Sequence, residues 1–281
     1  MKKQKQKRKK TKAGLVTLIF LGAGVACVLI HVVHALTLDK TIEYKEITFR
    51  SLNVPAHMDG YRIAFIVDTH SLEPLRLVQV KDELNNRQID LLVLGGDYSH
   101  GSSLLGYSME TFSQIKTTDG VFGVEGNHDR SALLYPAMEE RAITPLSNSG
   151  LYLQEQFYLA GTSDLWSRNA SIAQAIDESK PEDFVLLLSH NPDIAMQQST
   201  SGVDLILSGH THAGQMTFFG VWAPLFTFDG SITEYGQRFR SGWAQSAEGV
   251  PVYVSSGTGE YMPRVFARPQ VILITLKHEV S

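Results

Sequence analysis

The amino-acid sequence predicts an α/β fold of the mixed α+β kind, preceded by an N-terminal membrane-spanning helix. Three observations lead to this prediction. After residue 40, short runs of Val, Ile, Leu and Phe alternate with amphipathic stretches. Near the start, one stretch of 24 residues carries no Lys, Arg, Asp or Glu. The 281 residues, 43% of them hydrophobic, are enough for one large domain with its own core.

The first 36 residues have the composition of a membrane anchor. Residues 1–12 hold eight Lys or Arg and no acidic residue, and residues 13–36 form the uncharged stretch. As a helix this stretch would be roughly 36 Å long, enough to cross a hydrocarbon core of about 30 Å. The positive-inside rule then predicts a cytoplasmic basic tail and a single-pass protein of the cell membrane in which the rest of the chain is extracytoplasmic.

Two alternatives to this transmembrane signal anchor remain at the sequence level. Val33-His34-Ala35 resembles the small-x-small cleavage site of a signal peptide. The apolar stretch is longer than the roughly 7–15 residues usual in signal peptides, which favours an uncleaved anchor. The other alternative is a helix of a soluble core, and the strongly basic tail argues against it.

The remainder of the chain, residues 41–281, is expected to form one domain. Its predicted strands share short apolar runs bounded by Gly, Asp, Asn or Ser, and they cover residues 62–67, 91–94, 121–124, 184–188, 204–207, 252–254 and 271–276. Its predicted helices have amphipathic patterns and cover residues 74–86, 104–115, 131–141 and 172–179.

Charge and cysteine content exclude some classes of function. Eight of the 25 basic residues lie in the tail, so 17 remain against 29 acidic residues. An acidic domain is a poor generic binder of nucleic acid, because phosphate contacts need Lys and Arg. Cys27 is the only cysteine, which excludes an intramolecular disulfide and a cysteine-based zinc cage. Nothing in the sequence indicates an obligate protein partner.

Five predicted strands end on groups that can bind a metal ion. The stretches are IVDTH (66–70), LVLGGD (92–97), VFGVEGNHD (121–129), VLLLSH (185–190) and LILSGHTH (205–212). Sites in α/β sheets form at the carboxyl ends of strands. Each stretch alone also fits a turn with a capping Asp or Asn, or a structural histidine. Because the five stretches contain five of the ten histidines, we favour a shared metal site.

The spacing and the donor atoms support this interpretation. In an extended segment, residues two apart point to the same face, so Asp68 with His70, and His210 with His212, would each present two ligands together. The set of Asp, His and Asn without thiolate suits Mn, Fe, Zn, Co or Ni. The candidates are too many for one ion, and two ions sharing a bridging carboxylate fit better.

The order of these residues resembles the calcineurin-like metallophosphoesterase superfamily. The pattern runs D-x-H at Asp68 and His70, G-D at Asp97, G-N-H-D at residues 126–129, a lone His190, and G-H-x-H at residues 209–212. The resemblance implies a four-layer αββα sandwich, in which two mixed sheets pack face to face with helices outside.

The resemblance also implies roles for these residues. Asp68, His70 and His212 would hold a first divalent metal ion. Asn127, His190 and His210 would hold a second, and Asp97 would bridge the two. His128 would contact the phosphate or protonate the leaving oxygen, and Asp129 would orient His128 and favour its cationic form.

A narrower resemblance points to bacterial membrane-linked phosphodiesterases, including enzymes that act on UDP-2,3-diacylglucosamine. It rests on LSHNPD (188–193), SGHTHAGQ (208–215), AGTSD (160–164) and the C-terminal stretch 253–276. Arg264 and Arg268 fall in that last stretch, where a guanidinium could bind substrate phosphate, although an ordinary structural ion pair fits equally well.

The predicted function is hydrolysis of a lipid- or cell-envelope-linked, amphiphilic phosphodiester by a metal-bridging hydroxide, with two ions of Mn, Fe, Zn or Co. The alternatives are a non-catalytic metal-binding scaffold and a sensor of a phosphorylated ligand with the same fold. A scaffold that has lost catalysis would be expected to lack some of the ligand positions, and all of them are present here.

Overall fold

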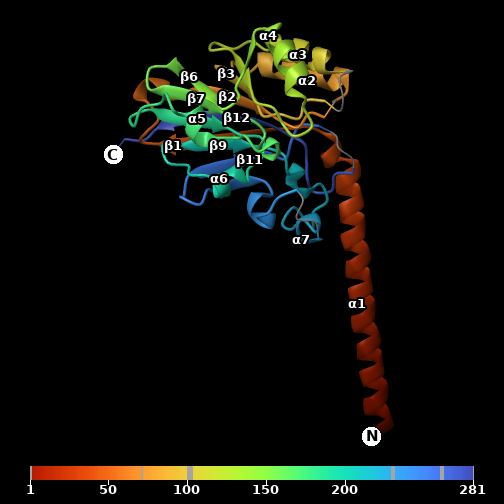
Figure 1. Cartoon of the computed structure of the whole chain (residues 1–281). Coiled ribbons are helices and arrows are strands. Elements are labelled where there is room, and N and C mark those ends of the chain that lie inside the picture. The colour runs from red at the N-terminus through yellow and green to blue at the C-terminus, as the bar shows by residue number, and fades with distance from the viewer. Residues whose placement is uncertain (1, 71, 100–103, 229–231, 260–262, 281) are drawn as a thin grey trace.

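The computed structural model describes the backbone of residues 2–70, 72–99, 104–228, 232–259 and 263–280, and side chains from residue 13 on, apart from residue 228. The chain divides into a projecting N-terminal helix and a layered domain, as Figure 1 shows. The C-terminus lies on the side of the domain opposite the helix.

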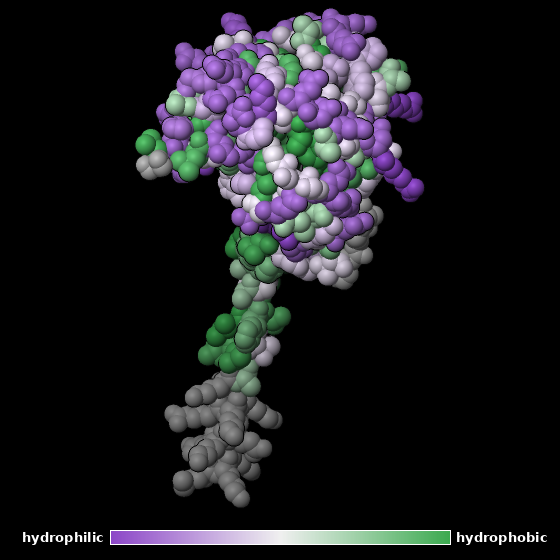
Figure 2. Space-filling view, turned by 60° about the vertical axis from the view of Figure 1, so that its left-hand side comes forward, coloured by the Kyte–Doolittle hydropathy of each residue, from purple (hydrophilic) through white to green (hydrophobic). Residues whose placement is uncertain are grey.

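The N-terminal helix α1 (Lys2–Leu36) runs straight away from the domain and is followed by the 3-10 helix η1 (Leu38–Lys40) (Figure 1). A window within Ala13–Lys40 is long and apolar enough to cross a membrane, and none of that window is buried against other parts of the described chain. In Figure 2 the hydrophobic colouring extends along this helix up to the domain. This exposure argues against the alternative of a helix within a soluble core.

Twelve strands in the described part of the chain form two six-stranded mixed sheets. The first sheet contains, in spatial order, β1 (Glu43–Ser51), β12 (Gln270–His278), β2 (Arg62–Ile66), β3 (Leu91–Leu94), β4 (Val121–Gly123) and β5 (Ile143–Pro145). The second contains β10 (Gly242–Gln245), β11 (Pro251–Val254), β9 (Leu205–Ser208), β8 (Phe184–Leu188), β7 (Phe157–Gly161) and β6 (Ser149–Gln154). Strands β2 to β5 are parallel, and so are β7, β8, β9 and β11.

The two sheets pack face to face, and helices cover their outer faces. On β2, Phe65 points into the core between the sheets, whereas Ile66 points outward. The outer face of the first sheet packs against α2 (Pro74–Asn85), α3 (Leu105–Ser113) and α4 (Ser131–Glu139). The outer face of the second packs against α5 (Ile172–Ala175) and α6 (Ile194–Gln197). The predicted four-layer αββα sandwich is therefore confirmed.

All seven predicted strands and all four predicted helices are present, and their ends differ from the prediction by at most four residues. The largest difference is at the helix predicted over 172–179, where α5 ends at Ala175 because Ile176 leaves the helical conformation, with φ −113° and ψ 11°. Strands β1, β5, β6, β7 and β10 were not predicted. Four of them lie at sheet edges, where half-exposed, short strands lack a continuous apolar run.

Shorter elements complete the domain. They are η2 (Ala56–Met58), η3 (Leu165–Ser167), η4 (His212–Gly214), α7 (Leu225–Phe228) and η5 (Gly236–Phe239). Asp39, which precedes the predicted domain boundary at residue 41, is buried and accepts hydrogen bonds from the backbone N–H groups of Phe266 and Ala267 at 2.8 and 3.1 Å. The end of α1 is therefore tied directly to the domain.

Candidate metal centre

The predicted metal ligands lie together where β2, β3, β4, β8 and β9 end. Asp68 and His70 follow β2, Asp97 follows β3, and Asn127 follows β4. From the other sheet, the predicted ligands His190, His210 and His212 follow β8 and β9. Because these parallel strands present their carboxyl ends at one place, both sheets contribute to a single cluster of donor atoms.

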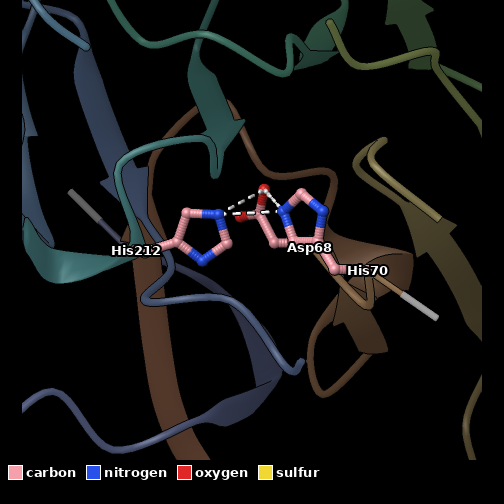
Figure 3. Close-up of side chains that lie close together, drawn as sticks. All are labelled: Asp68, His70 and His212. Carbon is pink, nitrogen blue, oxygen red and sulfur yellow. Dashed lines mark hydrogen bonds and ion pairs between the residues drawn. The ribbon is translucent and has the colours of Figure 1, made fainter. Parts of the chain in front are cut away.

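The first group of donors consists of Asp68, His70 and His212, and Figure 3 shows the two imidazole rings facing each other beside the carboxylate. The two Nε2 atoms are 2.9 Å apart. Oδ1 of Asp68 lies 3.8 Å from Nε2 of His70 and 3.7 Å from Nε2 of His212. The three donor atoms lie within 4.8 Å of one another, as the ligands of one metal ion do.

The second group gathers around His190. Nε2 of His190 lies 3.3 Å from Oδ2 of Asp97 and 3.2 Å from Oδ1 of Asn127. Nδ1 of His210 lies 2.9 Å from the same Asn127 oxygen. Oδ2 of Asp97 is also 3.6 Å from Nε2 of His70, so this carboxylate lies between the two groups, where a bridging ligand would lie.

The predicted reason for the convergence of these side chains was wrong. Asp68, His70, Asp97, His210 and His212 are not in extended backbone but have φ between 43° and 69°. This left-handed conformation is uncommon for residues other than glycine, and it persists where the surrounding structure enforces it. The ligands therefore converge because the chain turns sharply at each strand end.

Glycines permit these sharp turns at close quarters. A Cβ atom on Gly126 would lie 2.2 Å from Oδ1 of Asp97, and one on Gly209 would lie 2.5 Å from Oδ2 of Asp68. Neither distance is possible between non-bonded atoms. Only glycine at these two positions lets the backbone come this close to the carboxylates.

Two backbone carbonyls fix the orientation of two histidine rings on the side away from the cluster. His190 directs Nδ1 at the carbonyl of Gly95 at 2.8 Å, and His210 directs Nε2 at the carbonyl of Ile232 at 2.8 Å. Donation of these N–H groups leaves the opposite ring nitrogen facing the cluster, as in metal-binding histidines whose second nitrogen donates to a carbonyl. Burial, followed by the charge of His190, lowers the pKa of His210 to about 3, which keeps it neutral.

The pKa values of the two buried carboxylates, Asp68 and Asp97, shift in opposite directions. Burial is the largest effect on Asp68 and raises its pKa to about 7, although His190 partly offsets it. Burial also opposes ionisation of Asp97, but the charge and hydrogen bonds of His190 and the charge of His70 outweigh it and hold the pKa of Asp97 well below its usual value. The pKa of His190 rises to about 10, because its carboxylate neighbours outweigh its burial.

The donor set fits a pair of divalent cations. Oδ1 of Asp68 is buried and makes no hydrogen bond within the described chain, yet nitrogen atoms of three histidines lie within 4 Å of it. Neutral His210 turns its Nδ1 lone pair towards the Asn127 oxygen, so two acceptors are in contact. A cation between such atoms would satisfy both, and carboxylate, imidazole and amide donors suit Mn, Fe, Zn or Co.

His128 and Asp129 lie at the rim of this cluster. The His128 side chain is exposed, its ring centre lies 5.5 Å from that of His70, and its backbone N–H donates to Oδ1 of Asp97 at 2.9 Å. The Asp129 carboxylate accepts backbone N–H groups from Asp97, Tyr98 and Gly126 at 2.7, 3.1 and 2.9 Å. Asp129 therefore holds the loop that carries Asp97, and its predicted effect on His128 stays a prediction.

The two predicted substrate-binding arginines differ in their surroundings. Arg264 is 2% exposed, and its Nη1 donates to the carbonyls of Ser256 and Ala267, both at 2.8 Å. Its Nη2 lies 3.3 Å from Nδ1 of His212. Burial and the Arg264 charge together lower the pKa of His212 well below its usual value, so His212 stays in the neutral, metal-binding form. Arg268 is partly exposed and donates to the carbonyl and hydroxyl of Thr41.

A polar hollow beside the second group of donors was not predicted from the sequence. It is lined by Leu165, Trp166, Arg168, Asp193, Gln197, Ile232, Thr233 and Glu234. The Trp166 ring stands edge-on to His210 with ring centres 4.8 Å apart. Asp193 accepts hydrogen bonds from Thr233 and Glu234, which fixes the segment whose carbonyl orients His210. The AGTSD and LSHNPD stretches border this hollow, and they were the available sequence signal.

Comparison with known proteins gives concordant results. A family model described as calcineurin-like phosphoesterase matches residues 61–214. An uncharacterized metallophosphoesterase of Bacillus subtilis, YkuE, is 28% identical over 84% of this chain and 86% of the relative. The Escherichia coli phosphodiesterase YaeI is 29% identical over 77% and 82%. A Danio rerio transmembrane protein with a metallophosphoesterase domain is 29% identical over 80% of this chain and 55% of the relative.

Proposed function

The chain belongs to the calcineurin-like phosphoesterase family, and from this premise we propose that it is a phosphodiesterase dependent on two divalent metal ions. The observation that carries the proposal is the convergence of seven donor residues from both sheets in one cluster, in which Oδ1 of Asp68 is buried and makes no hydrogen bond within the described chain. The substrate is a lipid- or cell-envelope-linked phosphodiester, and the name of the E. coli relative supports the choice of a diester over a monoester.

The donor residues divide between the two ions as their distances favour. Asp68, His70 and His212 would hold one ion, Asn127, His190 and His210 would hold the other, and Asp97 would serve both. When bound, such a pair supplies positive charge to the phosphoryl oxygens and lowers the pKa of a water molecule. The protein points the histidine rings inward, keeps His210 and His212 neutral, and buries Asp68 away from bulk water.

His128 protonates the leaving oxygen of the substrate. Its side chain is exposed at the rim, next to His70, while its backbone N–H is fixed on Asp97. A proton donor at the edge of the cluster can contact the substrate phosphate without being a metal ligand itself. Such general acid catalysis contributes about 10²–10⁴-fold to a rate.

The hollow lined by Trp166, Arg168 and Glu234 receives part of the substrate beyond the phosphate. Trp166 is half-exposed and contacts His210, so a group lying on the indole would be next to the second ion. Arg168 adds a positive charge at the same opening. These features suit a substrate with a polar or ring-shaped group adjoining the diester.

The N-terminal helix anchors the enzyme in the cell membrane as a single pass, with the basic tail in the cytoplasm and the domain outside. Its support is the uncharged stretch 13–36, the eight basic residues before it, and relatives that are named as transmembrane proteins. An anchored active site suits an amphiphilic substrate. A reporter enzyme fused to the C-terminus determines the side, and activity only of a cytoplasmic reporter would refute this orientation.

Hydrolysis of bis(p-nitrophenyl) phosphate by the full chain in detergent, with added Mn²⁺, tests the proposed activity. We expect Asp97→Asn to lose more than about 100-fold in kcat/KM, because even indirect supports of metal ligands contribute 10–100-fold. His128→Ala should lose about 10²-fold or more with metal content unchanged. The matched controls Asp82→Asn and His57→Ala replace exposed residues outside the cluster and should retain activity.

The outcome separates the enzyme from the alternatives. Two bound metal ions without hydrolysis of any phosphodiester in a panel of lipid extracts and model diesters would refute the enzyme and favour a sensor or scaffold. Equal loss in the control variants would show that the assay reports folding instead of the site.

A further inference from the structure

An apolar surface lies where α1 meets the domain, and we define it as the juxtamembrane patch. It consists of Met216, Phe218, Phe219, Val221, Trp222 and Leu225, whose exposed fractions range from 37% to 75%. All six belong to the segment that follows η4, and this segment and α7 lie on the side of the domain that faces the projecting helix (Figure 1). Such a concentration of exposed aromatic and aliphatic side chains marks an interaction surface.

The juxtamembrane patch is continuous with the surface of α1. The His31 ring of α1 contacts the rings of Phe218, Phe219 and Phe266, with ring centres 5.4, 4.5 and 4.9 Å apart. His34 stacks on Phe266 at 3.8 Å and hydrogen-bonds through Nδ1 to Asp39 at 2.8 Å. Because Asp39 also accepts two backbone N–H groups of the domain, the helix and the patch are held in one fixed arrangement.

The height of the contact along α1 determines what surrounds the patch. A hydrocarbon core of about 30 Å takes up about 20 helical residues, so a core beginning at Ala13 would end near residue 32. His31 lies about 7.5 Å before the end of the helix at Leu36. The side chains of Phe218 and Phe219 therefore meet α1 at the level of the bilayer boundary.

The composition around the patch also suits a bilayer surface. Aromatic side chains such as Trp222 are enriched at the boundary between hydrocarbon and water. A hollow next to the patch is lined by His34, Lys45, Gly220, Arg240 and Arg268 among others, with Glu43 as its acidic member. Its excess of basic groups matches the phosphate groups of lipids, as in interfacial segments that combine an apolar face with Lys and Arg.

We propose that the juxtamembrane patch inserts into the same bilayer that α1 spans, so that the catalytic domain lies down on the membrane surface. The proposal rests on the membrane-anchor part of the proposed function and is independent of hydrolysis. The proposal also bears on substrate access, because the patch is connected to the proposed metal centre in two ways. Met216 lies four residues after His212, and the N–H of Thr217 donates to the carbonyl of Val265, next to Arg264. The opening of the metal centre is thereby held near the lipid head groups.

The test uses the full chain with Cys27 replaced by alanine, one cysteine introduced for a spin label, and one protein molecule per lipid nanodisc containing phosphatidylglycerol and phosphatidylethanolamine. Val221→Cys reports on the patch. Val280→Cys is the matched control, since this valine is 88% exposed and adjoins the C-terminus, which lies on the side of the domain opposite the helix (Figure 1). Leu21→Cys reports whether α1 is in the bilayer.

We expect the label at residue 221 to be several-fold more accessible to oxygen, relative to a water-soluble nickel chelate, than the label at residue 280. Equal accessibility at 221 and 280 would overturn the proposal, and so would protection of 221 that appears only with two protein molecules per disc, which would indicate a second copy as the occupant. A water-exposed label at residue 21 would refute the anchor itself. None of these readouts depends on metal or hydrolysis, so a failed proposal here leaves the proposed activity unaffected.

Discussion

Replacement of Arg264 by methionine tests whether its guanidinium stabilises the fold or binds the substrate. The Arg264 side chain is buried and donates to the carbonyls of Ser256 and Ala267 at 2.8 Å each. Methionine fills much of the same volume but leaves both carbonyls without these donors. Each buried, unsatisfied carbonyl costs about 1–3 kcal/mol, so Arg264→Met should lower the free energy of unfolding by about 4 kcal/mol.

Thermal unfolding of the metal-free full chain in detergent measures this loss. For a domain of this size, 1 kcal/mol shifts the midpoint by about 2–4 °C, so we expect a decrease of about 10 °C. Arg268→Met is the matched control, because Arg268 is partly exposed and bonds only to Thr41 among the contacts identified, and we expect a loss below about 1 kcal/mol.

One result would refute this reasoning. If Arg264→Met unfolds within about 2 °C of the unmodified chain but raises KM for the diester about tenfold, the guanidinium acts on substrate. The conformation with Arg264 turned inward would then not be the working one. A fall in both stability and metal affinity, by contrast, would agree with its contact to His212 at 3.3 Å.

Three further predictions concern the metal centre. Gly126→Ala places a Cβ atom 2.2 Å from Oδ1 of Asp97, so Mn²⁺ affinity measured by calorimetry should fall more than about 10-fold, and unchanged affinity would show that the loop can yield. In metal-free protein, burial raises the pKa of both Asp68 and Asp129 to about 7. Ionisation is then harder in the folded chain than in the unfolded one, so each carboxyl contributes stability that is full below about pH 4 and is lost towards pH 7, whereas the lowered pKa of His210 and His212 contributes in the opposite direction over this range. With chelator present, Asp129→Asn isolates one carboxyl: the variant should gain stability relative to the unmodified chain as the pH rises from 4 to 7, and a constant difference in unfolding midpoint would contradict it. Trp166→Ala should raise KM more than it lowers kcat for a bulky diester, whereas a pure loss of kcat would place Trp166 outside substrate binding.

From the sequence, the residues that cluster together could be predicted better than the backbone that presents them. Polar groups at strand ends and their order were enough to select residues whose donor atoms the structure brings together, because each follows a short apolar run typical of a buried strand. The left-handed backbone of Asp68, His70 and Asp97 could not be read in the same way, since residues other than glycine rarely adopt it and the sequence carries no mark of it. The structure enforces it through contacts between distant loops, such as the N–H of Asp97 on the Asp129 carboxylate.

The edge strands and the surface around α1 escaped prediction for a related reason. Strand β1 has no continuous apolar run and places two charged residues, Lys45 and Glu46, side by side, and its partner β12 lies more than 200 positions away in the chain. The aromatic residues of the juxtamembrane patch look in sequence like a buried segment, but the structure exposes them and brings Phe218 and Phe219 into contact with His31 of α1. Both features depend on pairings over long sequence distances, which local patterns do not encode.

The position of the metal centre between the sheets makes it sensitive to how they pack. Oδ2 of Asp68, from the first sheet, accepts the backbone N–H of His210, from the second, at 2.9 Å. His190 of the second sheet bonds to the carbonyl of Gly95 in the first. A Cβ atom on Gly209 would lie 2.3 Å from the Val67 side chain, so the two sheets pack too closely here to accommodate even one additional methyl group. A shift of one sheet against the other would separate the predicted ligands, so we expect metal affinity to depend on the packing of the two sheets.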